Sequence, residues 1–110
     1  MKSQQVLLTT TVLALAALTA RRFAGFDGNV CAAGAKALGV IEVSTDADNA
    51  APANVLGVIL VEAGAAISAG AEVQSDASGK AITKAAGVGN GFAWDAATAA
   101  GDLIRIVRGI

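Results

Sequence analysis

The sequence has no histidine and a single cysteine, so it lacks residues on which many functional sites depend. One cysteine excludes a disulfide framework within the chain, and without histidine the common zinc ligand sets cannot be assembled. Catalysis also loses its most frequent general base. We therefore expect no catalytic residues, no metal site and no cofactor, and we interpret Cys31 as a small buried apolar side chain.

Aromatic residues and net charge are also scarce. Aromatic side chains make up 4% of the 110 residues, and eight basic and nine acidic residues leave a formal net charge of −1. So small a charge gives no field that would hold nucleic acid. Few large side chains leave a thin core, which contacts with other subunits would supplement. The single tryptophan and the absence of tyrosine disfavour a carbohydrate-binding module, and we expect no small-molecule substrate.

The first twenty residues imitate a secretory signal, with Lys2 followed by an apolar run and small residues up to Ala20. Three threonines interrupt that run, and a pair of arginines follows it. The run is too short and too rich in threonine to cross a membrane as a helix, so we expect no membrane partner. We prefer an extended N-terminal arm and first strand over residues 1–17, and a signal peptide over residues 1–20 stays open as the alternative.

The arm supplies the candidate contacts with a partner, because its apolar residues fall on both faces of the expected strand and both faces then need cover. The adjacent arginines that follow can form bidentate pairs with carboxylates on another surface. The residues that we expect at a partner interface are Val6, Leu7, Leu8, Val12, Arg21, Arg22 and Phe23.

Residues 18–110 read as a single β-rich domain. Glycine-bounded turns predict a hairpin over residues 63–83. The strongly β-forming run over residues 54–63 predicts a central strand that is buried on both faces. Residues 102–108 alternate in polarity and predict a last strand, on which Arg105 and Arg108 would protect a sheet edge.

Helix is expected only in short turns. Asp95 is placed to cap one helical turn over residues 96–100, and residues 14–22 are compatible with either helix or strand, since Ala and Leu favour helix and Thr favours strand. The fold that we expect is mainly β, a small β-barrel or sandwich with an extended N-terminal arm and at most one or two short helical turns.

Four segments in a fixed order carry a resemblance that extends from about Leu18 onward. They are LTARRFAGFDG, GAKALGV, VEAGAAISAGAEVQSDASGKAIT and AATAAGDLIRI. The series resembles the small capsid cement, or head-decoration, proteins of tailed bacteriophages. The resemblance implies a β-rich subunit without catalytic residues, which binds the outer face of an icosahedral shell, often as a trimer, and clamps neighbouring major capsid proteins.

The resemblance therefore implies a structural virion protein, not an enzyme, on the outer surface of the capsid and made in the bacterial host cytoplasm. Its expected partner is the major capsid protein, and it is expected to be a homo-oligomer, with a trimer favoured and a dimer as the alternative. Two other functions stay open: a secreted or periplasmic small β-domain, and a non-catalytic accessory domain.

Overall fold

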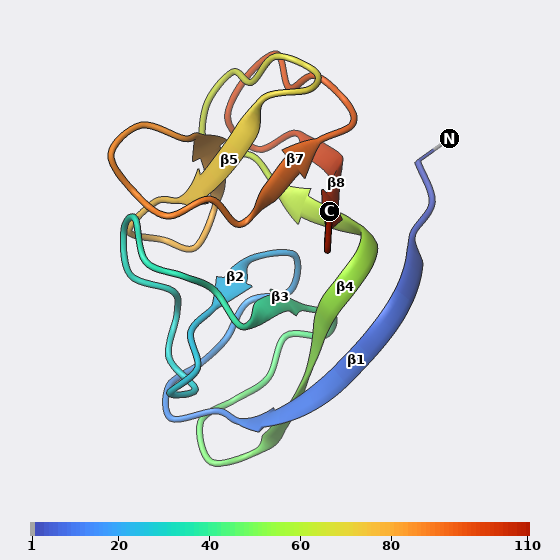
Figure 1. Ribbon diagram of the computed structural model, residues 1–110. Coiled ribbons are helices and arrows are strands. Elements are labelled where there is room, and N and C mark those ends of the chain that lie inside the picture. Colours follow the sequence, from blue (N-terminus) through green and yellow to red (C-terminus); the bar gives the residue numbers. More distant parts are fainter. Residues whose placement is uncertain (1) are drawn as a thin grey trace.

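The structure is a computed structural model that describes residues 2–110, and every regular element within them is a strand (Figure 1). The mainly β fold expected from the sequence is therefore confirmed. The strands are β1 (Gln5–Leu13), β2 (Phe23–Ala24), β3 (Gly39–Ile41), β4 (Ala50–Glu62), β5 (Glu72–Ser75), β6 (Ala81–Thr83), β7 (Gly91–Ala93) and β8 (Leu103–Arg108).

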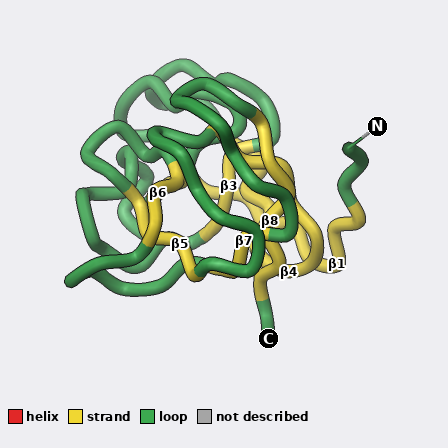
Figure 2. Tube along the Cα trace, turned by 90° about the horizontal axis from the view of Figure 1, so that it is seen from above, coloured by secondary structure: helices red, strands yellow, loops and turns green. Residues whose placement is uncertain are grey.

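All eight strands belong to one sheet, which curls into a small, nearly closed barrel (Figure 2). The strand order is β2-β3-β4-β8-β7-β5-β6, and β1 pairs with β4 beside this path. The two ends of the path approach each other, because the Phe23 N–H on β2 donates a 2.7 Å hydrogen bond to the Gly79 carbonyl in the β5–β6 turn. Closure of this kind removes most exposed sheet edges.

Strand β4 organises the barrel, since it pairs with three other strands (Figure 1). One edge of β4 carries β1, and the other carries first β3, up to Asn54, and then β8, from Gly57. Between these two partners, the edge at Val55 and Leu56 has no strand partner among residues 2–110. The three-way pairing of β4 thus leaves a gap in the barrel wall.

The expectation of a central strand at 54–63 is confirmed, but burial on both of its faces is not observed. Ile59 and Val61 point into the barrel and are fully buried, whereas Leu60 and Glu62, which alternate with them, are only partly buried. The reason is the barrel geometry, since one face of each strand lines the interior and the other looks outward.

The core has two parts. The larger cluster fills the barrel with Phe23 and the inward residues of β4 and β8, and it includes Cys31, which is buried as expected. A smaller cluster lies under the N-terminal half of β4. The members of the smaller cluster are Ala14, Leu18, Ala24, Ile41, Ala51 and Ala53. Burial of each large aliphatic side chain in either cluster contributes about 1.5–3 kcal/mol to the free energy of folding.

The predicted hairpin over residues 63–83 is confirmed at its second half, where β5 and β6 pair antiparallel. Its turn is held by the Asp76 carboxylate, which accepts the backbone N–H groups of Ser78 and Lys80 at 2.8 Å and 2.9 Å. An acidic side chain that folds back on its own turn in this way is a common means of fixing a tight hairpin.

The prediction of a helical turn over residues 96–100 is wrong, because these residues form an irregular segment with a bend, a turn and a single bridge at Ala97. The Asp95 carboxylate does not cap a helix; it binds Arg105 instead. Residues 14–22 are neither helix nor strand apart from a bridge between Leu18 and Thr45. No helix among the described residues is long and apolar enough to cross a membrane.

Candidate partner-binding surface

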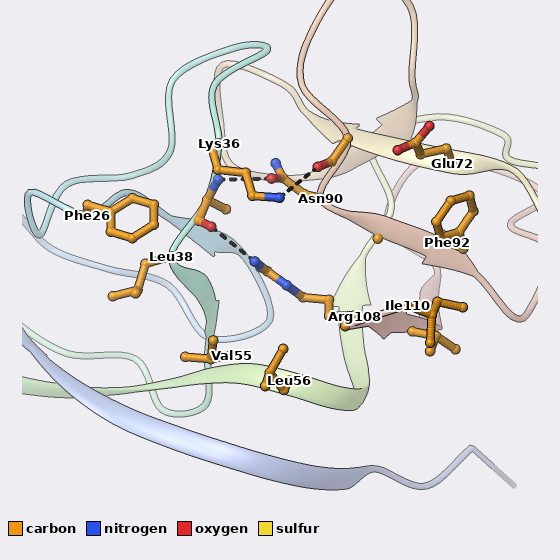
Figure 3. Close-up of a pocket in the computed structure, with 15 residues that line it drawn as sticks. Phe26, Lys36, Leu38, Val55, Leu56, Glu72, Asn90, Phe92, Arg108 and Ile110 are labelled. Carbon is orange, nitrogen blue, oxygen red and sulfur yellow. Dashed lines mark hydrogen bonds between the residues drawn. The ribbon is translucent and has the colours of Figure 1, made fainter.

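An open groove of about 440 Å³ lies where β3 and β8 part along the edge of β4 (Figure 3). Its rim is shared by the segment before β3, the middle of β4, strand β7 and the end of β8. In Figure 3 the side chains that it exposes surround a common space. The larger apolar residues of the lining are Phe26, Leu38, Val55, Leu56, Phe92, Val107 and Ile110.

Four of these apolar side chains remain well exposed. Phe26 is 67% exposed, Ile110 is 86% exposed, and Leu56 and Phe92 are each 37% exposed. Single exposed apolar residues are ordinary on a protein surface, but a group of them around one groove typically marks an interaction site. The groove is therefore the first candidate for a contact with another macromolecule.

Arg108 crosses the groove and ties its two sides together. The Arg108 Nη2 donates a 3.1 Å hydrogen bond to the carbonyl of Ala37, which precedes β3, while Arg108 itself ends β8. The Nη1 atom is buried and has no hydrogen-bond partner among the described residues. Burial lowers the pKa of Arg108, yet an arginine keeps its charge in proteins.

Asn90 fixes the wall of the groove from behind (Figure 3). Its side chain is buried, accepts the Ala37 N–H at 3.0 Å and donates to the Ala35 carbonyl at 3.0 Å. The Lys36 Nζ, between these two residues, donates to the Gly89 carbonyl at 3.2 Å. These bonds hold residues 35–37 against the loop before β7, so the groove is built on a fixed backbone.

The apolar surface extends from the groove over the outer face of β7 and β8. Phe92 lies opposite Val107 in the ladder, and Val107 lies opposite Val58 on β4. Trp94 and Leu103 are 53% and 43% exposed. Paired residues of neighbouring strands point to the same face of a sheet, so this outer face is largely apolar.

The one charged side chain on the outer face of β8 is neutralised by a neighbour. The Arg105 guanidinium makes two 2.9 Å hydrogen bonds to the Asp95 carboxylate, and its centre lies 4.0 Å from the centre of the Trp94 ring. The hydrogen bonds from Arg105 lower the pKa of Asp95 to about 2. This face thus carries an ion pair in place of a free charge.

Strand β1 holds the expected partner residues in two different environments. Leu7 and Leu8 are 78% and 46% exposed, and Leu8 lies opposite Leu56, next to the groove. Val6 and Val12 are partly buried, because they pack against the larger and the smaller core cluster. The sequence placed all four at an interface, and the structure leaves only the two leucines well exposed.

The three residues after the arm serve this chain's own fold. Arg21 forms an ion pair with Glu42, and the Arg22 Nε lies 3.1 Å from the Glu62 carboxylate. Phe23 is only 1% exposed and belongs to the larger core cluster. We therefore remove Phe23 from the expected interface, since its ring has no surface to offer a partner in this fold.

Sequence reasoning missed the groove and the outer face of β7 and β8. The alternation over residues 102–108 already placed Leu103 and Val107 on one side of the last strand. An apolar residue on the outward side of a barrel strand is the signal that could have indicated this surface. Among residues 2–110 there is no group of three or more Cys, Asp or Glu side chains that could hold a metal ion.

Comparison with known proteins identifies a protein family and a solved structure of similar fold. The phage cement protein family matches residues 1–108. The crystal structure of the N base of the head fibre gp8.5 of bacteriophage phi29 is similar in fold, with a TM-score of 0.74 and 23% sequence identity over 93% of each chain. No curated protein matches the chain in sequence. The chain belongs to the phage cement protein family and is a structural protein of the phage capsid.

Proposed function

We propose that this chain binds the outer surface of an assembled phage shell and stabilises contacts between major capsid proteins. It acts there as a structural, non-enzymatic component of the virion. Support comes from its family, which has cement proteins as members, and from a surface suited to contact with another protein. Binding of this kind would also stabilise the chain itself, because a partner that recognises only the folded form shifts the folding equilibrium.

The observation that carries the proposal is the set of exposed apolar side chains around the groove between β3 and β8. Exposed apolar and aromatic side chains on a fixed backbone are what the centre of a protein interface uses. Phe26, Leu56, Phe92 and Ile110 meet this description, and the buried Asn90 holds the adjacent wall. A major capsid protein that places an apolar side chain in the groove would cover all four.

The proposal is tested by pelleting the protein with undecorated phage shells. The native chain should pellet with the shells at a fixed stoichiometry, and Phe92→Ser should bind at least about 10-fold more weakly, because loss of one central apolar contact costs about 1.4 kcal/mol or more. Val88→Ser is the matched control, since Val88 is 46% exposed but does not line the groove.

The outcomes separate the role from the site. A native chain that stays in the supernatant at micromolar concentrations contradicts the capsid-binding role. Native binding that Phe92→Ser leaves unchanged contradicts the assignment to the groove and leaves the role intact. Equal loss in Phe92→Ser and Val88→Ser would indicate a general effect on folding, and circular dichroism of each variant checks for that effect.

We also propose that the chain is a closed homo-oligomer in which residues 1–17 form an arm on the domain of residues 18–110. The arm contributes contacts between copies through Leu7 and Leu8, while Val6 and Val12 pack against the core beneath it. Arg21 and Arg22, each with a side chain 29% exposed, join this contact while they remain paired with Glu42 and Glu62. The resemblance favours three copies, and a dimer is the alternative. Solution mass from light scattering distinguishes these arrangements directly.

A further inference from the structure

Strand β1 has a free edge. It pairs with β4 on one side, and no strand of residues 2–110 pairs with its other side. In Figure 1 it forms the outer margin of the molecule. The other strands with a single partner are β2 and β6, which are only two and three residues long. Each has a further hydrogen bond: β2 donates one to the Gly79 carbonyl, and β6 accepts one from the Gly64 N–H. The nine-residue β1 is thus the one long open edge of the described sheet, and Gly28 approaches it only at the Leu13 end.

The register shows which backbone groups point outward from this edge. Thr11 lies opposite Pro52, whose carbonyl accepts the Glu42 N–H on the far side of β4 and whose nitrogen has no hydrogen. Opposite residues of an antiparallel pair either exchange both hydrogen bonds or neither. The N–H and C=O of Thr11 therefore point away from β4, and by the alternation of the ladder those of Thr9 do as well.

From Thr9 onward the edge carries no charge, no proline and no bulge, which are features that protect an open strand. Residues 5–13 contain no charged residue and no proline, although proteins usually blunt exposed edges with lysine, proline or a cover. A bulge at Leu7 and Leu8 interrupts the ladder, so the regular part of the edge begins at Thr9. A regular, uncharged row of free donors and acceptors fits an extended backbone better than any other ligand.

The amino-acid sequence of β1 is close to a palindrome, and this symmetry indicates which strand pairs with its open edge. Residues 7–13 read LLTTTVL, and Thr10 lies at the centre. A two-fold axis through Thr10 places residues of similar chemistry opposite each other in two antiparallel copies of β1. Because the segment has no charged residue, the pairing brings no like charges together. The pairs across the axis are Leu7 with Leu13, Leu8 with Val12, and Thr9 with Thr11.

We propose that β1 of one copy pairs antiparallel with β1 of a second copy across a two-fold axis at Thr10. Thr9 of each copy then exchanges hydrogen bonds with Thr11 of the other, which uses the groups that point outward. Leu7 and Leu13, 78% and 57% exposed in the single chain, lie at the ends of this pairing, beyond its regular part. This contact rests on the homo-oligomer proposed above and is independent of the capsid-binding role, because it involves only copies of this chain.

The first test is the mass of the native chain and two variants. Light scattering should give twice the chain mass at tens of micromolar. Thr11→Pro should raise the dissociation constant at least about 10-fold, because proline removes an outward N–H and is tolerated at an edge strand. Thr11→Val, which keeps the N–H, should remain a dimer. A native monomer or trimer overturns the proposal, as does a Thr11→Pro variant that stays a dimer.

A second test does not depend on Thr11→Pro folding. In the proposed pair the two Thr10 residues form a non-hydrogen-bonded position, where Cα atoms lie about 4.5 Å apart, within reach of a disulfide. Thr10→Cys should therefore form a cross-linked dimer when copper phenanthroline and air accept the two electrons of the paired thiols. Thr83→Cys, at an exposed site on β6, should remain monomeric on a non-reducing gel. No cross-link at position 10 overturns the proposal.

Discussion

The guanidinium of Arg105 lies 4.0 Å from the centre of the Trp94 ring, and the two residues are neighbours across the β7–β8 ladder. Asp95, the next residue after Trp94, holds the same guanidinium in place with two hydrogen bonds of 2.9 Å. Such a cation–π contact contributes about 0.5–1 kcal/mol at an exposed site. The arrangement fixes an exposed tryptophan without leaving a free charge beside it.

Asp95→Asn is predicted to lower the free energy of unfolding by about 1 kcal/mol at neutral pH, since it removes a charge-assisted pair. The pKa of Asp95 lies at about 2 in the folded chain, below the ordinary value of 3.8. The stabilisation is therefore complete above pH 3.8 and is lost as the pH falls toward 2. Urea unfolding measured from pH 7 to pH 2 should show that the difference in the free energy of unfolding between the native chain and the variant disappears between pH 3.8 and pH 2. Asp46→Asn, an exposed loop carboxylate, serves as the control and should show no such gap.

Gly57→Ala is predicted to destabilise the chain by about 3 kcal/mol. Gly57 has a φ of +112°, and a Cβ there would lie 2.4 Å from the Gln5 carbonyl oxygen and 2.9 Å from the Leu7 nitrogen. Both atoms are backbone of β1, so they cannot move aside cheaply. Gly70→Ala is the control: its φ is +85° but its Cβ would meet nothing within 4 Å, so a cost of about 1 kcal/mol is expected. Similar urea midpoints for the two variants would contradict the prediction.

Asn90→Ala is predicted to cost about 2–3 kcal/mol, because it leaves the Ala37 N–H and the Ala35 carbonyl without their side-chain partner. It should also loosen the groove wall, which hydrogen exchange at residues 35–37 would show as faster exchange. Asn49→Ala is the comparison, since the Asn49 side chain bonds only exposed carbonyls of its own turn. Unchanged protection of residues 35–37 in Asn90→Ala would show that another contact holds the wall.

Cys31 is predicted to react with a thiol reagent at least ~100-fold more slowly in the native chain than in urea at the same pH. The side chain is 1% exposed, and burial raises the pKa of its thiol. Absorbance of the released chromophore at pH 8 measures both rates. Rapid modification of the native chain would mean that the segment around Cys31 opens readily, contrary to its place in the core.

The β class of the fold and several strands follow from local sequence. The hairpin at β5 and β6 is specified by Asp76 and Gly79, because an acidic side chain and a positive φ make that turn wherever the rest of the chain lies. Ile104 and Ile106 alternate with outward residues in the last strand, and both are buried as that period requires. Local sequence preferences were therefore enough to predict the features that depend only on residues close together in the sequence.

The roles of the arginines could not be read in the same way. Arg105 and Arg108 were expected to protect a sheet edge, but β8 pairs with β4 and β7 and has no free edge. Arg108 crosses to Ala37, which is 71 residues away in sequence. The partner of a long charged side chain is chosen by what the fold brings near it, and nothing in the local pattern records that choice.

The sequence by itself determined that this is a small β protein without the histidine and cysteine sets of common sites, and its β1 segment carries the near-palindrome around Thr10. Only the tertiary structure decided which face of each strand looks outward and which edge stays open. The physical reason is that alternation specifies two faces but not which one the barrel encloses. The pairing of β4 with β3 and then β8 also opens the groove at Leu56, and that gap depends on contacts between distant segments.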